Sequence, residues 1–156
     1  MSFTRWLESR RGQAPDIVGP IYGYRIWTGR EGFLWSFYVV GCKWPVGDLL
    51  EAICMNERGH APISKCPHIE GKPTPHIGSK CGIWMLNDPG KLPIKAGIAG
   101  VCEIGGRVVK GTEGWRAQFA RPVALKHEDW NEQEVAELAK TYGCQLIEDW
   151  PDWRPS

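Results

Sequence analysis

The sequence CMNERGHAPISKCPHIEGKPTPHIGSKCGIW, at residues 54–84, is the stretch around which we expect the fold to be organised. It brings three thiols and an imidazole within one loop's reach of each other, although it contains no Cys-x-x-Cys pair. Zn²⁺ prefers thiolate sulfur and imidazole nitrogen, and a closed tetrahedral shell of three cysteines and one histidine is a common structural form. The sequence therefore predicts a structural zinc site with the ligands Cys54, His60, Cys66 and Cys81.

Two further histidines leave the nitrogen ligand open. His68 and His76 lie in an insert at residues 67–80, and either could replace His60 because both are within loop reach of the flanking cysteines. The prolines and glycines of the insert cannot sustain a helix or a sheet ladder, so it is expected to be a surface loop. Buried, inert cysteines are the alternative to a metal site, because free cysteine packs as a small apolar side chain. Disulfides are a third possibility.

Four blocks follow one another along the chain: C-x5-H-A-P-x3-C from residue 54, C-G-I-W from 81, G-V-C-E-I-G-G-R-V-V-K from 100 and G-W-R-A-Q-F-A-R-P from 114. Their order resembles a family of small uncharacterised proteins from actinobacteria and their phages, over residues 22–125. The H-A-P-x-x-x-C and G-W-R-A blocks are the most specific parts of the likeness. The chain departs from the family pattern at the insert, where the family has a single residue. The resemblance implies a zinc-ligand cluster that includes His60 and a phage or prophage origin, and it implies no activity.

The composition indicates one domain without a strongly charged surface. A chain of 156 residues buries enough surface to fold without a metal or a disulfide. Lys and Arg number 19 against 18 Asp and Glu, and this net charge of +1 favours no polyanionic partner. Residues 1–11 contain no apolar run, so we expect neither a signal peptide nor a membrane span, and a cytoplasmic location. In a reducing compartment Cys42, Cys102 and Cys144 are expected to be thiols.

Alternating aromatic and β-branched residues predict an antiparallel sheet. A hairpin and a short strand that delivers Cys54 to the metal are expected first. A turn and a three-stranded meander follow, with the strands of the meander joined at Gly105-Gly106 and at residues 111–114. The expected strands occupy residues 22–28, 33–40, 49–54, 98–104, 107–110 and 115–121, and the first turn lies at 87–90.

The last part of the chain predicts a helix. Asp129 is expected to cap it and Gly143 to end it, with a short edge strand after it. The fold class is therefore α+β: a β-rich antiparallel sheet or meander with a zinc-stapled loop and one C-terminal helix. We expect a single zinc-stabilised domain with an N-terminal arm at residues 1–20 and a tail at 148–156 that folds back onto the body.

Two groups of residues are candidate binding residues. Arg25 and Trp27 share one face of the first strand, where an arginine beside an indole suits stacking on a base, a peptide or another ring if the face is open. A pair that simply covers the sheet is the alternative. The second group is the basic strand block, which comprises Arg107, Lys110, Trp115, Arg116 and Arg121. Because side chains alternate along a strand, its charges do not all line one face.

These features favour a zinc-stabilised, non-catalytic binding or adaptor protein that engages a protein partner. A full ligand shell leaves no open coordination position for water, which weighs against catalysis. One alternative is a nucleic-acid-binding protein that uses the basic strand block. The other is a zinc-dependent hydrolase, in which one cysteine leaves the metal and Glu57 or Glu103 acts as the base.

Overall fold

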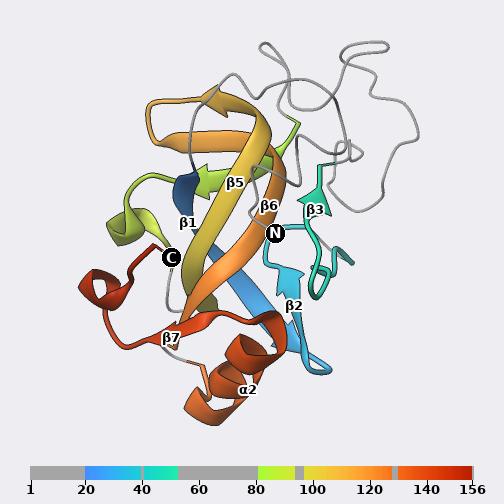
Figure 1. The fold of residues 1–156 in the computed structure, drawn as a ribbon, viewed down its shortest axis with the longest axis vertical. Helices are drawn as coiled ribbons and strands as arrows, with labels where there is room; N and C mark the ends of the chain where they lie inside the picture. The colour runs from blue at the N-terminus through green and yellow to red at the C-terminus, as the bar shows by residue number, and fades with distance from the viewer. Residues whose placement is uncertain (1–19, 40, 53–80, 94–96, 128–129, 156) are drawn as a thin grey trace.

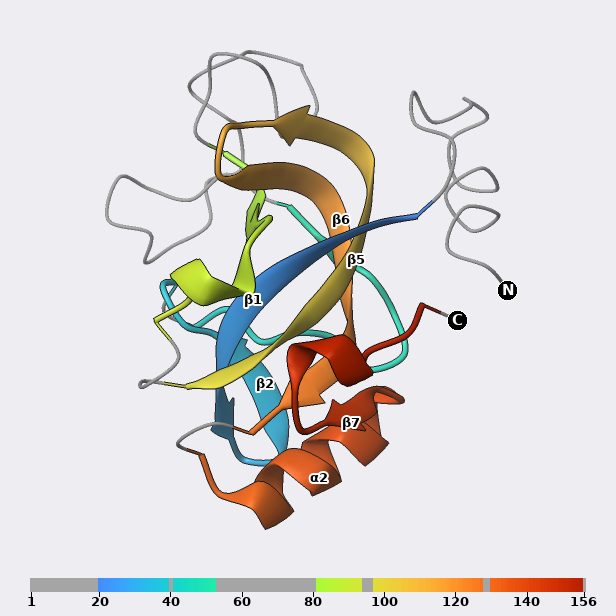
Figure 2. The ribbon, with the colours of Figure 1, turned by 90° about the vertical axis from the view of Figure 1, so that its left-hand side faces the viewer.

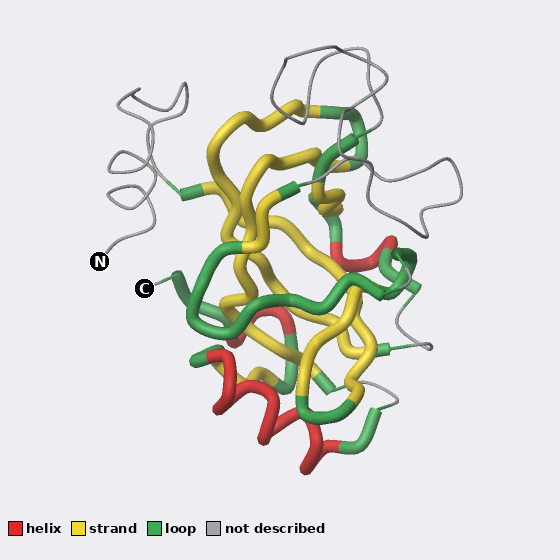
Figure 3. Tube along the Cα trace, turned by 90° about the vertical axis from the view of Figure 1, so that its right-hand side faces the viewer, coloured by secondary structure: helices red, strands yellow, loops and turns green. Residues whose placement is uncertain are grey.

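The computed structural model describes residues 20–39, 41–52, 81–93, 97–127 and 130–155, which form a curved β-sheet with one α-helix (Figures 1 and 3). The expected α+β, β-rich class is confirmed. Within these ranges, no helix has the length and apolar character needed to cross a membrane. In chain order the elements are β1 (Ile21–Arg30), β2 (Phe33–Ser36), β3 (Leu50–Glu51), β4 (Ile83–Leu86), η1 (Pro89–Lys91), β5 (Ile98–Lys110), β6 (Gly114–Lys126), α2 (Glu132–Tyr142), β7 (Gln145–Ile147) and η3 (Trp150–Asp152).

Four strands pair in a closed circuit. β1 pairs with β5, β5 with β6, and β6 with β4, all antiparallel. β4 returns to β1 where Leu86 lies opposite Tyr24. Each of these four strands is therefore paired, over at least part of its length, with two others of the circuit. The side chains on the inside of the circuit form the main core together with α2 and β2. The largest buried side chains of this core include Trp27, Leu34, Trp44, Ile98, Ile104 and Leu125.

The expected three-stranded meander is wrong at Gly105-Gly106. β5 continues through both glycines, and its register with β6 shifts between Gly105 and Val108. Gly106 has a φ of 74°, and a Cβ there would lie 2.7 Å from the ring of Phe119. The glycine pair therefore forms a bulge that bends a long strand, rather than a hairpin turn. The turn at residues 111–113 does join β5 to β6, as predicted.

The other edge of β6 pairs in succession with β4, β3 and β7. The pairing with β7 is parallel, which corrects the expectation of a wholly antiparallel sheet. The reason is the connection: α2 carries the chain back along the sheet before β7 begins, and a crossover of this kind joins parallel strands. The expected short edge strand after the helix is confirmed.

β3 and β4 occupy adjacent positions on that edge. The Ala52 N–H donates to the Gln118 carbonyl at 2.7 Å, and Ile83 lies opposite Ala117, the next residue of β6. Figure 1 shows β3 beside β6 on the side away from β5. Ala52 and Ile83 thus lie opposite neighbouring residues of β6.

Asn131 caps α2, in place of the expected Asp129, which lies outside the described residues. The Asn131 side chain accepts a hydrogen bond from the Glu134 N–H at 3.0 Å. At the other end, Gly143 adopts the left-handed conformation with a φ of 67° and ends the helix as predicted.

One face of α2 covers the core. Val135 and Leu138 are buried on this face. The Tyr142 hydroxyl accepts from the Leu34 N–H at 3.0 Å and donates to the Trp44 carbonyl at 2.8 Å. These two bonds attach the end of the helix to β2 and to the segment that follows it.

The C-terminal tail folds back, as expected. Trp153 packs edge-to-face against Tyr22 with ring centroids 4.6 Å apart, and Trp150 packs against Tyr24 in the same way at 5.3 Å. Figure 2 shows this segment returning beside β7. The two indoles cover the outer side of β1 and build a second, smaller apolar cluster.

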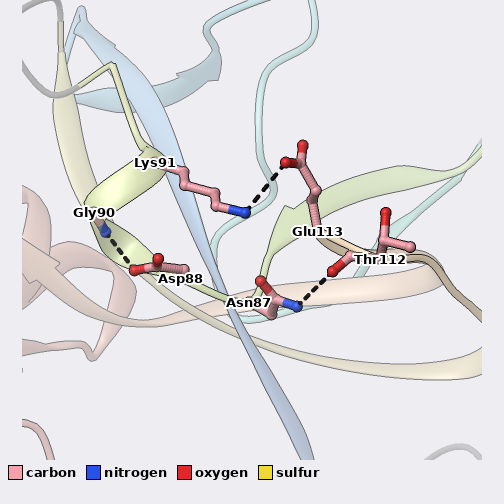
Figure 4. Close-up of polar contacts among 6 residues, drawn as sticks. All are labelled: Asn87, Asp88, Gly90, Lys91, Thr112 and Glu113. Atoms are coloured by element: carbon pink, nitrogen blue, oxygen red, sulfur yellow. Dashed lines mark hydrogen bonds and ion pairs between the residues drawn. The ribbon is translucent and has the colours of Figure 1, made fainter.

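The expected turn after β4 is the short helix η1. The Asp88 carboxylate caps it by accepting from the Gly90 N–H at 2.8 Å (Figure 4). Lys91 forms an ion pair with Glu113 at 3.2 Å, and the Asn87 side chain donates to the Thr112 carbonyl at 3.3 Å. These contacts attach η1 to the turn between β5 and β6.

We expect Gly114→Ala to lower the free energy of unfolding by about 3 kcal/mol, because the new Cβ would overlap the Met85 carbonyl across the β4–β6 pairing. Gly111→Ala is the matched control in the same hairpin. Its Cβ would meet nothing nearer than the Gly114 carbonyl at 3.5 Å, so a change within about 0.5 kcal/mol is expected. Urea unfolding of both variants measures the difference, and equal stabilities would contradict the close approach of β4 to β6.

Candidate functional site

Of the four predicted zinc ligands, Cys81 lies within the described residues. Among the described ranges, no group of three or more His, Cys, Asp or Glu side chains is positioned to hold a metal ion. The remaining metal candidates lie outside the described residues, and so does the proposed base Glu57. These candidates are Cys54, His60, Cys66, His68 and His76.

The main chain at Cys81 is held by a buried arginine. Arg116 is 9% exposed and donates from Nη1 to the Cys81 carbonyl at 2.9 Å. Its guanidinium also lies 5.4 Å from the ring centroid of Trp84, which is its register partner across β4 and β6. Arg116 therefore fixes the backbone just before β4 to the centre of the sheet. This role differs from the phosphate contact that its position in the basic strand block suggested.

Arg25 lies where β2 and β4 separate along one edge of β1. Its Nη1 donates to the Trp84 carbonyl at 2.6 Å, and its Nη2 donates to the Ser36 hydroxyl at 3.3 Å. The guanidinium also lies 5.2 Å from the ring centroid of Trp44. Backbone pairing of β1 with β2 begins at Trp27, beyond Arg25. The Arg25 side chain thus connects β1 to both β4 and β2 between the positions at which the backbones of these strands pair.

The charge of Arg25 has no carboxylate partner in the described part of the chain. Its Nε is buried and makes no hydrogen bond there. Burial lowers the pKa of the guanidinium, and the weaker opposing influences come from Cys102, Cys42 and Tyr38. These neighbours are thiols and a phenol rather than carboxylic acids.

Trp27 is not available to a ligand. It is 0% exposed and packs edge-to-face against Trp44 with ring centroids 5.4 Å apart. A Cβ at Gly100 would lie 2.9 Å from the Trp27 ring, which shows how closely the sheet approaches it. The open-face interpretation of the Arg25 and Trp27 pair is therefore wrong for the indole, which belongs to the core.

The basic strand block does not form one surface. Arg121 donates from Nε to the Glu103 carboxylate at 2.8 Å, and Trp115 is half-buried against the core. Arg107 and Lys110 are exposed. With Arg116 buried, the basic side chains have separate environments, so they do not provide a continuous track for phosphates.

Of the two candidate bases for a hydrolase, Glu103 lies within the described residues. Its exposed fraction is 7%. Its carboxylate is paired with Arg121, with one contact of 2.5 Å from Nη2. A carboxylate held in this way stabilises the β5–β6 pairing, because the two residues are register partners.

Three cysteines outside the predicted metal site are free thiols, as expected: Cys42, Cys102 and Cys144. Burial raises the pKa of Cys102, and it raises that of Cys144 to about 12. Both thiols are therefore protonated at neutral pH, and a buried protonated thiol is a poor nucleophile and a poor metal ligand.

Sequence reasoning did not identify two exposed aromatic side chains. Trp84 is 57% exposed and Tyr38 is 69% exposed. Trp84 lies in an I-W-M-L run whose alternation of buried and exposed side chains marks β4 as a strand. The run is apolar at all four positions, so the sequence did not show which of its side chains is exposed, because that depends on how β4 docks in the sheet.

Comparison of the chain with protein-family models, with curated proteins and with solved structures gave no match. The inference of function therefore starts from the geometry and chemistry of the chain's own residues.

We expect no tight binding to mixed-sequence duplex or single-stranded DNA. Arg121 is paired and Arg116 is buried, so the dissociation constant at physiological salt should be no lower than about 10⁻⁶ M, in the non-specific range. A fluorescence anisotropy titration with labelled DNA tests this. A submicromolar constant that is lost in the Arg107→Ala, Lys110→Ala double variant would instead assign the strand block to nucleic acid.

Proposed function

We propose that this chain is a zinc-stabilised, non-catalytic binding protein that engages a protein partner. The observation that carries the proposal is the return of the chain to β6. Ala52 and Ile83 lie opposite neighbouring residues of that strand, although 30 residues separate them in the sequence (53–82). The two ends of the segment that contains the predicted ligands are therefore anchored next to each other.

Covalent geometry limits how far the end cysteines can lie from this anchor. Cys54 is two residues after Ala52, and Cys81 is two residues before Ile83. Two residues of extended chain span about 7 Å, so the Cα of each cysteine lies within that distance of one of two neighbouring sheet positions. This supports Cys54 and Cys81 as ligands of one ion, with Cys66 and His60 supplied by the chain between them.

The donor set fits zinc and a structural role. When bound, a zinc ion with four protein ligands would cross-link the loop and contribute to folding, and it would leave no position for an activated water. Arg116 would position the Cys81 ligand through the hydrogen bond to its carbonyl. Cys54, His60, Cys66 and Cys81 are therefore proposed as the ligands, with His76 and His68 in reserve.

A protein partner is favoured over a polyanion. The net charge is +1, and the basic strand residues within the described ranges are dispersed. Trp84 and Tyr38 present large aromatic surface to solvent, and such residues are enriched where proteins bind one another. We further propose a cytoplasmic location, because the thiols Cys42, Cys102 and Cys144 suit a reducing compartment.

Protein purified without added metal is expected to contain about one zinc ion per chain, because a structural site retains its ion through purification. Inductively coupled plasma mass spectrometry measures the content. A strong chelator should also lower the midpoint of urea unfolding, since the binding free energy of a structural metal contributes to folding. A zinc content near zero together with an unfolding midpoint that ignores the chelator would remove zinc from the proposal.

Among the histidines, His60 is expected to be the ligand. His60→Ala should weaken zinc binding by more than the roughly 10- to 100-fold typical of residues that stand behind the ligands. His76→Ala and His68→Ala are the matched controls and should leave the affinity near that of the parent chain. Competition with a chromophoric chelator measures all three variants. Should His76→Ala prove the damaging change, the insert supplies the nitrogen ligand instead.

A further inference from the structure

One side of the β1–β2 hairpin carries two cations that each lie over an aromatic ring. The Arg30 guanidinium lies 3.8 Å from the ring centroid of Trp35, and the Lys43 ammonium lies 3.2 Å from that of Phe33. The Trp35 indole also donates to the Arg30 carbonyl at 3.1 Å. Both cations are exposed, and both rings are half-buried. We call Arg30, Phe33, Trp35 and Lys43 the hairpin face.

The register places these four side chains on the side of the sheet that is turned away from the core. Arg30 lies opposite Phe33 in the β1–β2 pairing, and Lys43 lies opposite Trp35 in a single bridge on the other edge of β2. Residues directly opposite each other share a face of a sheet, and so do alternate residues of one strand. Leu34, between the two rings in sequence, points the other way and is 0% exposed. Three adjacent chain segments therefore contribute to one outer surface.

The positive charge of the hairpin face is not balanced within the described residues. Arg30 and Lys43 form no ion pair there, and Glu31 in the hairpin turn forms none with them, whereas Lys91 is paired with Glu113 at 3.2 Å. The two cations lie over alternate residues of β2, and such residues are about 7 Å apart along a strand. Like charges that are close together repel, so an anionic group that contacts both would lower the electrostatic energy.

We propose that the hairpin face binds an acidic segment of a partner protein, whose carboxylates pair with Arg30 and Lys43. Arginine and tryptophan are among the residue types that dominate binding energy at protein interfaces. A cation that already rests on a ring has less conformational freedom to lose on binding than a free side chain has. This inference rests on the proposed function for the class of the partner, and it adds the surface and the chemistry that the surface recognises.

An acidic protein segment suits this surface better than a nucleic acid does. Proteins that bind single strands stack the bases on aromatic rings. The rings of Phe33 and Trp35 are each covered by a cation, so a base could stack on them only after displacing it. A phosphate backbone alone would meet two cations, which provides only weak and salt-sensitive binding. A carboxylate displaces nothing, because it approaches each cation from the solvent.

The test titrates the full chain with the capped peptide acetyl-Ser-Glu-Ser-Glu-Ser-amide, whose carboxylates occupy alternate positions as the two cations do. The same peptide with Gln at both Glu positions is the neutral control. The indole N–H signal of Trp35 in ¹H–¹⁵N spectra reports binding, because this group lies beside Arg30. We expect saturable shifts with a dissociation constant on the order of 1 mM, since so small a probe covers only part of an interface. The neutral peptide should bind at least about tenfold more weakly, because it cannot form charged pairs.

Variants show whether the two cations are responsible. Arg30→Gln and Lys43→Gln should each weaken binding of the acidic peptide at least about threefold, and the double variant should abolish the preference for Glu over Gln. Lys110→Gln is the matched control, because Lys110 is an exposed cation on β5 and its loss changes the net charge equally. All three positions are exposed, so the variants are expected to keep the fold, and the midpoint of urea unfolding checks this.

Three results would overturn the proposal. They are equal binding of the acidic and neutral peptides, an equal loss of affinity in Lys110→Gln, and tighter binding of the thymidine trinucleotide, which carries the same two negative charges, than of the acidic peptide. Zinc content is measured in the same samples. Acid-dependent binding by a chain without zinc would sustain this inference and remove the metal, whereas a zinc-loaded chain that binds neither peptide would do the reverse.

Discussion

Backbone hydrogen bonding along both edges of β6 is the interaction on which the rest of the structure depends. One edge pairs with β5 over most of its length, and the other pairs in turn with β4, β3 and β7. Because a buried N–H or C=O without a partner is costly, each short strand is held in register by β6 rather than by its own length. Gly114 permits the closest of these approaches, since any side chain there would overlap the β4 backbone.

β4 is held in place by two arginine side chains. Arg116 holds the carbonyl of Cys81, just before its first residue, and Arg25 holds the carbonyl of Trp84 within it. These hydrogen bonds from charged donors are stronger than neutral ones, and each requires the guanidinium to stay at its carbonyl. A metal bound through Cys81 would therefore act on the start of this four-residue strand.

The contacts of Arg25 and Arg116 also explain why the basic side chains of the described strands are dispersed. A long flexible cation can cover apolar area while its charged end reaches a backbone carbonyl, and both Arg25 and Arg116 are used in this way. Arg121 is paired with Glu103. Charge counted from the sequence therefore overstates the charge that a ligand could meet.

The sequence by itself determined the β-rich α+β class, the first hairpin, the turn before β6, the end of α2 at Gly143 and the short strand after it. These features follow from local periodicity and from turn and cap chemistry.

Only the tertiary structure decided that Gly105-Gly106 bends a continuous strand, since a glycine pair suits a bulge as well as a turn. It also decided that β7 runs parallel to β6, because strand direction depends on the path of the connection. The burial of Trp27 and the exposure of Trp84 were likewise decided in three dimensions. Both indoles lie on strands that alternate two faces, and alternation shows which residues share a face but not which face the rest of the chain covers.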